Sequence, residues 1–165
     1  MNVFTKGTPA RLADVPNGEC FAFDIGNQIA FGIKIAYPQS QDSRVLVLTR
    51  GGGQPPSLLG RQEAPPRIVY KLPAMAVVTG TAPNQLRDGV GNPRPGNVMV
   101  IGDEVFVGFL DEHNDPSSAS LKTGLIDPNP LNGAAAVFET WKIEFHGGGE
   151  PEPVFAYNPT PARAA

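Results

Sequence analysis

The chain has 165 residues and a mass of 17.5 kDa, the size of one ordinary domain. It contains 19 glycines and 18 prolines, and so many helix breakers exclude a coiled coil or a helical bundle. The net charge is −3, and the basic residues are scattered without a run of three. We therefore expect no nucleic-acid partner, because phosphate neutralisation needs clustered lysine and arginine.

The sequence also predicts no membrane partner, since it has neither a long apolar run nor a polybasic amphipathic segment. Residues 1–10 lack the apolar core of a signal peptide, which predicts synthesis in a cytoplasm. Cys20 is the only cysteine, so no internal disulfide can form. We expect Cys20 to be a small buried hydrophobe and not a nucleophile.

A first β-hairpin is predicted around Gly26 and Asn27. Apolar residues alternate with polar or small ones in 21–25 and again in 29–35. Glycine supplies the positive φ that the first central position of a type II′ turn requires. A third strand over 45–49 is apolar on both faces, as a buried central strand is. Further strands are predicted at 68–70 and 75–79.

The second half begins after residues 81–97, which are rich in turn-forming residues and predict a connecting loop. A second hairpin of the same turn type follows, with strands at 98–101 and 105–110 around Gly102-Asp103. A long polar loop is expected over 111–133, with a short strand near 121–126. The remaining predicted strands are a long one over 137–145, with one face in the core and one in water, and a short one at 154–157.

Three similarities between the halves predict an internal duplication. Residues 25–33 align with 101–109. A glycine triplet, an amide or acid and a proline recur at 51–55 and 147–151, and a closing motif recurs at 68–73 and 154–159. The expected repeats cover about 14–73 and 92–159.

The predicted fold class is all-β: a sandwich or a pair of fused small barrels with extended Pro/Gly-rich loops and terminal arms. Residues 1–80 form the first repeat with its arm, 81–97 connect, and 98–165 form the second repeat with its arm. Each repeat alone is too small for a stable core, so the two are expected to share one.

Candidate reactive groups are few. A proline soon follows each glycine triplet, where a phosphate-binding loop has lysine and a helix, so the triplets predict strand connections. The acidic run 111–115 lacks the EF-hand pattern and predicts a solvated loop, with a weak cation site as the alternative. His113 and His146 stand outside any catalytic or zinc spacing, and Glu139 shares the apolar face of Trp141. We expect no catalytic, cofactor-binding or metal-binding residue.

In length, composition and β-rich character the chain resembles small phage virion proteins, above all capsid decoration (cement) proteins. The resemblance implies a non-enzymatic structural subunit of a symmetric assembly, located in the virion. Its expected partners are capsid or other virion subunits, including further copies of itself. One alternative is a binding module for carbohydrate or peptide that uses the loops 51–66 and 111–133. A second is an enzyme of unrecognised type built on His113 or His146.

Overall fold

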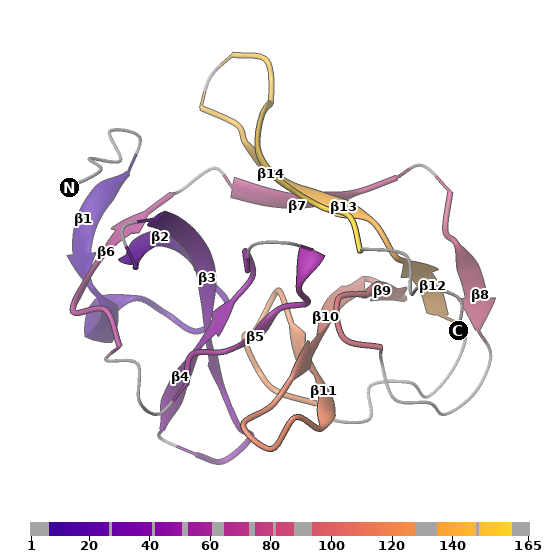
Figure 1. The fold of residues 1–165 in the computed structure, drawn as a ribbon, viewed down its shortest axis with the longest axis horizontal. Helices are drawn as coiled ribbons and strands as arrows, with labels where there is room; N and C mark the ends of the chain where they lie inside the picture. The colour runs from indigo at the N-terminus through magenta and orange to yellow at the C-terminus, as the bar shows by residue number, and fades with distance from the viewer. Residues whose placement is uncertain are drawn as a thin grey trace.

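The computed structural model describes residues 7–26, 28–40, 42–50, 53–60, 65–72, 75–80, 82–87, 94–127, 135–147 and 149–159. These residues form two β-sheets and one short 3-10 helix, η1 (Leu12–Asp14), so the all-β prediction is confirmed. The two sheets share a core, as in a sandwich (Figure 1).

The strands of the larger sheet are β1 (Thr8–Arg11), β2 (Cys20–Ile25), β3 (Gln28–Ala36), β4 (Ser43–Val47), β5 (Ser57–Leu58), β6 (Ile68–Lys71), β8 (Gln85–Arg87), β9 (Val98–Ile101), β10 (Glu104–Leu110), β11 (Pro116–Ser120) and β12 (Ala135–Phe138). Those of the smaller sheet are β7 (Met75–Thr79), β13 (Trp141–Phe145) and β14 (Glu152–Tyr157).

Both predicted hairpins are confirmed. Ile25 pairs with Gln28 and Ile101 with Glu104, so each turn has two central residues. Gly26 and Gly102 have φ of +54° and +60°, the left-handed conformation that glycine adopts without strain. The buried central strand is confirmed as well. Val45, Leu46 and Val47 are buried, so both faces of this part of β4 are covered, and Leu48 directly after the strand is also buried.

The two halves of the chain use the same strand pairing. In the first half the order is β1-β6-β2-β3-β4, and in the second it is β8-β12-β9-β10-β11, with every pair antiparallel. The first set lies on the left of Figure 1 and the second on the right. Each half also lends a short segment to the other: β5 pairs in parallel with β10, and Leu125 forms a parallel bridge with Ala36.

This correspondence differs from the alignment that the sequence suggested. By position in the sheet the counterpart of β4 is β11, and that of β6 is β12. The sequence alignment instead matched β4 with the strand before Gly147, and β6 with β14. The similarity of the hairpins is therefore reproduced in the strand order, while the closing motifs do not occupy equivalent places. The glycine triplets lie in part outside the described residues.

Three predicted elements are corrected. The expected loop 81–97 contains β8, which pairs with β12. In the expected loop 111–133 the strand is β11, and residues 125 and 126 form only isolated bridges. The expected long strand 137–145 is two strands in different sheets, with the break at Glu139 and Thr140.

The small sheet lies along the top of the molecule in Figure 1, where it crosses both halves. Its order is β14-β13-β7, all antiparallel. β7 follows β6 directly and β13 follows β12 directly, so these two strands are also counterparts. They pair with each other, and Val77 opposite Ile143 is the central pair of five.

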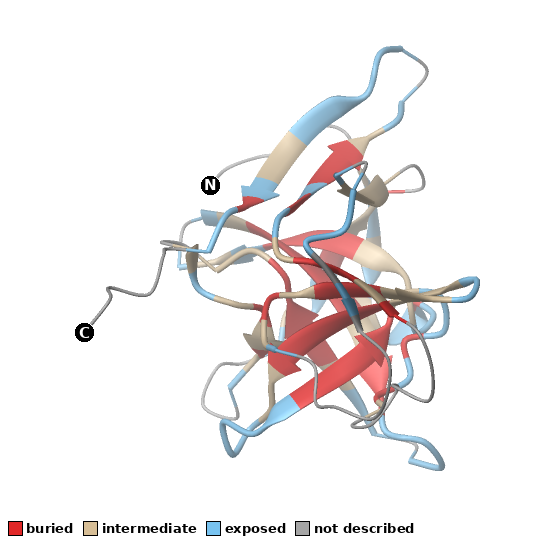
Figure 2. Ribbon diagram, turned by 90° about the vertical axis from the view of Figure 1, so that its right-hand side faces the viewer, coloured by how far each residue is buried: buried red, intermediate tan, exposed pale blue. Residues whose placement is uncertain are grey.

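The largest apolar cluster lies between the two halves and under the small sheet, and it includes Phe31, Phe109 and Trp141. Figure 2 shows these buried segments at the centre and the exposed connection between β13 and β14 projecting from the top. Each half has a smaller cluster on the other face of its strands. Corresponding positions fill the two smaller clusters: Phe23 and Met99, Ile25 and Ile101, Ala30 and Phe106, Val69 and Val137.

Most of each predicted terminal arm lies outside the described residues. Residues 8–11, which precede the expected first repeat, form β1 at the edge of the large sheet. Within the described part of the chain, no helix is long and apolar enough to span a bilayer.

Candidate functional site

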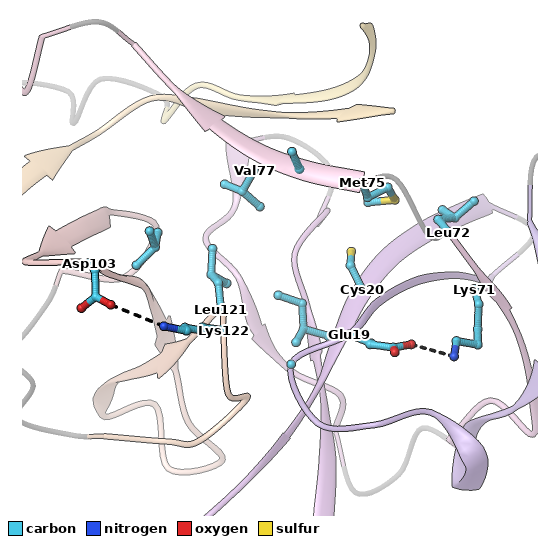
Figure 3. A pocket seen from close by; sticks show the side chains of 13 residues that line it. Glu19, Cys20, Lys71, Leu72, Met75, Val77, Asp103, Leu121 and Lys122 are labelled. Atoms are coloured by element: carbon cyan, nitrogen blue, oxygen red, sulfur yellow. Dashed lines mark hydrogen bonds and ion pairs between the residues drawn. The ribbon is translucent and has the colours of Figure 1, made fainter. Parts of the chain in front are cut away.

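A cleft of about 580 Å³ lies beneath β7, where the two halves meet (Figure 3). Its size falls in the range of small-ligand and side-chain pockets. One wall comes from the first half and the opposite wall from the second. The side chains that line it are mainly apolar: Cys20, Ile33, Leu72, Met75, Ala76, Val77, Val105 and Leu121.

The rim of the cleft carries two ion pairs, one from each half. Lys71 Nζ lies 2.9 Å from Glu19 Oε2, and Lys122 Nζ lies 3.5 Å from Asp103 Oδ2. Figure 3 shows the first pair on one side of the opening and the second on the other. Each charge is matched by its neighbour, so the rim favours neither an anionic nor a cationic ligand. The cleft therefore suits an uncharged apolar group.

Cys20 stands in the wall of this cleft, with its sulfur directed toward β7 (Figure 3). Burial raises the pKa of the thiol to about 12, which a hydrogen bond from the backbone of Phe21 only partly offsets. The thiol is therefore protonated at neutral pH, and a protonated thiol is a poor nucleophile. Cys20 is only half-buried, because it faces the cleft, so the predicted buried position is only partly observed.

β7 has one unpaired edge above this cleft. It is the last strand of its sheet, so among the described residues only β13 pairs with it. All five of its residues are half-buried. Met75 and Val77 point from β7 into the cleft (Figure 3). An open edge above an apolar cleft can take up a further strand.

The counterpart edge, on β13, is covered by β14. Tyr157 is opposite Trp141 and stacks on it, with ring centroids 5.2 Å apart, and Phe155 lies 5.9 Å from the same ring. Trp141 Nε1 donates a hydrogen bond of 2.8 Å to the carbonyl oxygen of Gly96. A Cβ at Gly96 would lie 2.1 Å from the Tyr157 hydroxyl, so only glycine leaves room for this ring. The outer edges of β7 and β13 thus differ, because among the described residues only that of β13 is covered, by β14 with its aromatic side chains.

A second cleft, of about 740 Å³, lies where residues 58–60 and Pro65 meet Glu112 and His113. These residues belong to the two long loops that the sequence favoured as a binding surface. Its described lining holds no phenylalanine, tyrosine or tryptophan, which disfavours stacking of a sugar ring.

The acidic run 111–115 is a turn stabilised by Asp111. The Oδ1 atom of Asp111 accepts hydrogen bonds from the backbone N–H groups of His113, at 2.8 Å, and Asp115, at 2.9 Å. Within the described residues no group of three acidic, histidine or cysteine side chains could hold a metal ion. His113 Nε2 lies 3.9 Å from Glu112 Oε1, beyond hydrogen-bond range.

His146 lies 3.5 Å, from Nε2 to Oε2, from Glu144. Glu144 was expected on a solvated face but is buried, with Lys142 forming an ion pair with the same carboxylate. This cluster lines neither of the clefts described above. Glu139 lies at the break between β12 and β13, where its backbone N–H donates to Asn84 Oδ1 at 2.9 Å, so it does not share a strand face with Trp141 as expected.

The sequence did not identify the cleft, because its lining comes from five separate segments of the chain. No family model, curated protein or solved structure matches the chain, so the arguments for function rest on its own geometry.

Proposed function

We propose that the protein is a non-enzymatic structural subunit that binds other proteins in a larger symmetric assembly. The observation that supports this most directly is the open edge of β7 above an apolar cleft. Soluble proteins protect such edges, because an unpaired strand recruits other chains. An edge left open beside apolar side chains is therefore best explained by a partner.

The groups around the cleft support a binding role over a catalytic one. Cys20 is held as a neutral thiol, and the charged groups of the rim are engaged in ion pairs. A nucleophile needs an adjacent base or a lowered pKa, and the wall of the cleft offers Cys20 neither.

The finer part of the proposal is that the assembly is a phage virion and that the chain is a capsid decoration protein. It rests on the resemblance in size and β-rich character stated above. We further propose that the chain arose by duplication of one β-unit, because its halves share strand order, two-residue hairpins and the positions of their small clusters.

The test is cofractionation with particles. Phage particles from the organism that encodes the chain are purified on a density gradient, and the chain is quantified against the major capsid subunit. A fixed copy number per particle that survives a high-salt wash supports the proposal. Absence of the chain from particles would refute the virion role, and a strict monomer that binds no particle protein would refute the assembly role.

A binding module for peptides is the second candidate, and the cleft between residues 58–60 and His113 favours it. Here the ligand would bind the loops and not the edge of β7. Replacing His113 by alanine would weaken the binding of such a ligand and would leave the binding to particles unchanged.

A further inference from the structure

The outer edges of β7 and β13, on the sides where these two strands do not pair with each other, are related by their pairing. The pair Val77–Ile143 is central, and Met75 lies opposite Phe145 just as Thr79 lies opposite Trp141. A half-turn about the central pair therefore exchanges Met75 with Trp141 and the free edge of β7 with the edge of β13 that β14 covers. The arrangement at β13 is thus a template for what the edge of β7 can bind.

At β13 the template has three parts. A strand pairs antiparallel with the edge, an aromatic ring lies opposite Trp141, and a second ring lies two residues earlier, opposite Ile143. Residues directly opposite each other in an antiparallel pair place their side chains on the same face. A strand on β7 would therefore direct the side chains opposite Met75 and Val77 into the cleft, as those two residues themselves are directed.

The cleft has the space and the chemistry for such side chains. At about 580 Å³ it is larger than one aromatic side chain requires, and its walls are apolar. Aromatic anchors in a desolvated pocket account for most of the binding energy at protein interfaces. The matched ion pairs at the rim leave no charge that would require a charged ligand.

We propose that the free edge of β7 binds an extended segment of a partner protein, which adds as an antiparallel fourth strand. The segment carries aromatic or large apolar side chains at alternate positions, and the one opposite Met75 enters the cleft. This inference rests on the proposed role as a protein-binding subunit and names the chemistry of the partner. The motif is aromatic–small–aromatic, as in Phe155-Ala156-Tyr157 of β14.

The probe is a fluorescent peptide with the sequence of residues 151–159, which presents this motif. Binding to the intact protein is followed by fluorescence anisotropy. A control peptide replaces Phe155 and Tyr157 by serine and keeps the length and charge. We expect saturable binding of the first peptide and binding at least ten-fold weaker for the second.

Two protein variants each fill the cleft with a phenylalanine ring, from opposite walls. If one variant does not fold, the other still provides the test. Cys20→Phe acts from the first half and Val105→Phe from the second. Either one is expected to weaken peptide binding at least ten-fold. The matched control is Ala156→Phe, which adds the same ring at an exposed position of β14 without changing the charge and should leave binding unchanged. Circular dichroism and thermal unfolding establish that each variant is folded.

Hydrogen exchange shows where the peptide binds. Protection that appears at residues 75–79 supports the added strand. Loss of protection at 152–157 instead would mean that the peptide displaces β14 from β13, and it would refute the proposal. Binding that is unaffected by both filling variants would refute it as well.

Other occupants give different outcomes. If the protein alone forms a dimer that Cys20→Phe dissociates, the edge binds a second copy, and a separate partner is excluded. If the peptide binds only after deletion of residues 1–6, the natural occupant is that segment, and the proposal is wrong. If the chain cofractionates with particles but does not bind the peptide, this inference is refuted and the proposed function stands. If it binds the peptide but is absent from particles, the virion role is refuted and this inference stands.

Discussion

The outer edges of β7 and β13 are related by the pairing of these two strands, but among the described residues only the edge of β13 is covered by a further strand. The edge of β13 is paired with β14, and Trp141, Phe155 and Tyr157 pack together beside it. The edge of β7 has no partner among the described residues, and a cleft lies where the rings would be. One half of the molecule therefore completes its own sheet, while the other half leaves the equivalent place open.

The difference shows how two halves with the same strand order can leave one strand edge covered and the related edge open. A strand and two aromatic rings close one edge and add stability there. Without such a strand, the other edge keeps the same backbone geometry and an apolar cavity. The following predictions test whether the two edges differ energetically as they do in structure.

The largest effect is expected at the closed edge. Tyr157→Ala should lower the free energy of unfolding by about 3 kcal/mol, because a buried stacked ring is lost and a cavity remains. Met75→Ala, at the position that the half-turn relates to Trp141, should cost about 1 kcal/mol, because Met75 already borders an open cleft. Urea unfolding followed by the fluorescence of Trp141, the only tryptophan, measures both.

The same variants have a spectroscopic control. Tyr157→Ala should change the native emission of Trp141, whereas Met75→Ala should leave it unchanged. Equal losses of stability at the two positions would show that the edge of β7 is as well packed as that of β13. The proposed energetic difference between the two edges would then be wrong.

The junction between the halves should be nearly as sensitive. Gly124 has φ of +68°, and a Cβ there would lie 2.2 Å from the backbone nitrogen of Gly18. Gly124→Ala should therefore cost about 3 kcal/mol through backbone strain and overpacking. Gly102 has a similar φ and nothing within 4 Å of the added Cβ, so Gly102→Ala should cost about 1 kcal/mol.

Thermal unfolding monitored by circular dichroism compares the two glycine variants. A similar loss in both would mean that positive φ alone is responsible and that the halves are not tightly packed at Gly124. A small loss in both would mean that the backbone adapts easily at either place.

The sequence predicted the hairpins well because their signal is local. Alternating apolar residues around Gly26 and Gly102 determine both the turn and the face that is buried. The division of residues 137–145 between two sheets carries no such signal. It depends on long-range contacts, including the hydrogen bond from the backbone of Glu139 to Asn84.

β11 shows why other elements escaped prediction. Its sequence, Pro116 to Ser120, is small and polar, yet four of its residues are buried. Pairing with β10 and hydrogen bonds such as that from Ser118 to the carbonyl oxygen of Asp127 satisfy these groups. The cleft could not be predicted from the sequence either, because residues far apart in the chain meet there only after both halves are folded.

The open cleft should also give stability a dependence on pH. Burial raises the pKa of the Cys20 thiol from 9.0 to about 12, so the unfolded chain loses this proton first. Stability from this group is fully present below pH 9 and is lost as the pH rises toward 12. We expect a loss of about 1 kcal/mol by pH 10.

The loss is measured by urea unfolding at pH 8 and pH 10, as the difference between the wild type and Cys20→Ala. The difference removes contributions from tyrosines, including Tyr157, whose pKa is also raised by burial. If wild type and variant lose the same stability over this range, the thiol is not desolvated, and the cleft is wetter than the structure indicates.

The smallest effects are expected at the two rim ion pairs, and here the halves should differ only slightly. Lys71→Met should cost about 0.5 kcal/mol, because its pair with Glu19 is short and only partly exposed. Lys122→Met should change stability by less than about 0.3 kcal/mol, since its pair with Asp103 is longer and well exposed.

Unfolding in urea at low salt and in 1 M salt separates the electrostatic part of each loss of stability, because salt screens exposed charges. A cost at Lys71 that persists in high salt would show that its aliphatic stem contributes by packing at the rim, which would make this wall of the cleft more rigid than the wall around Lys122.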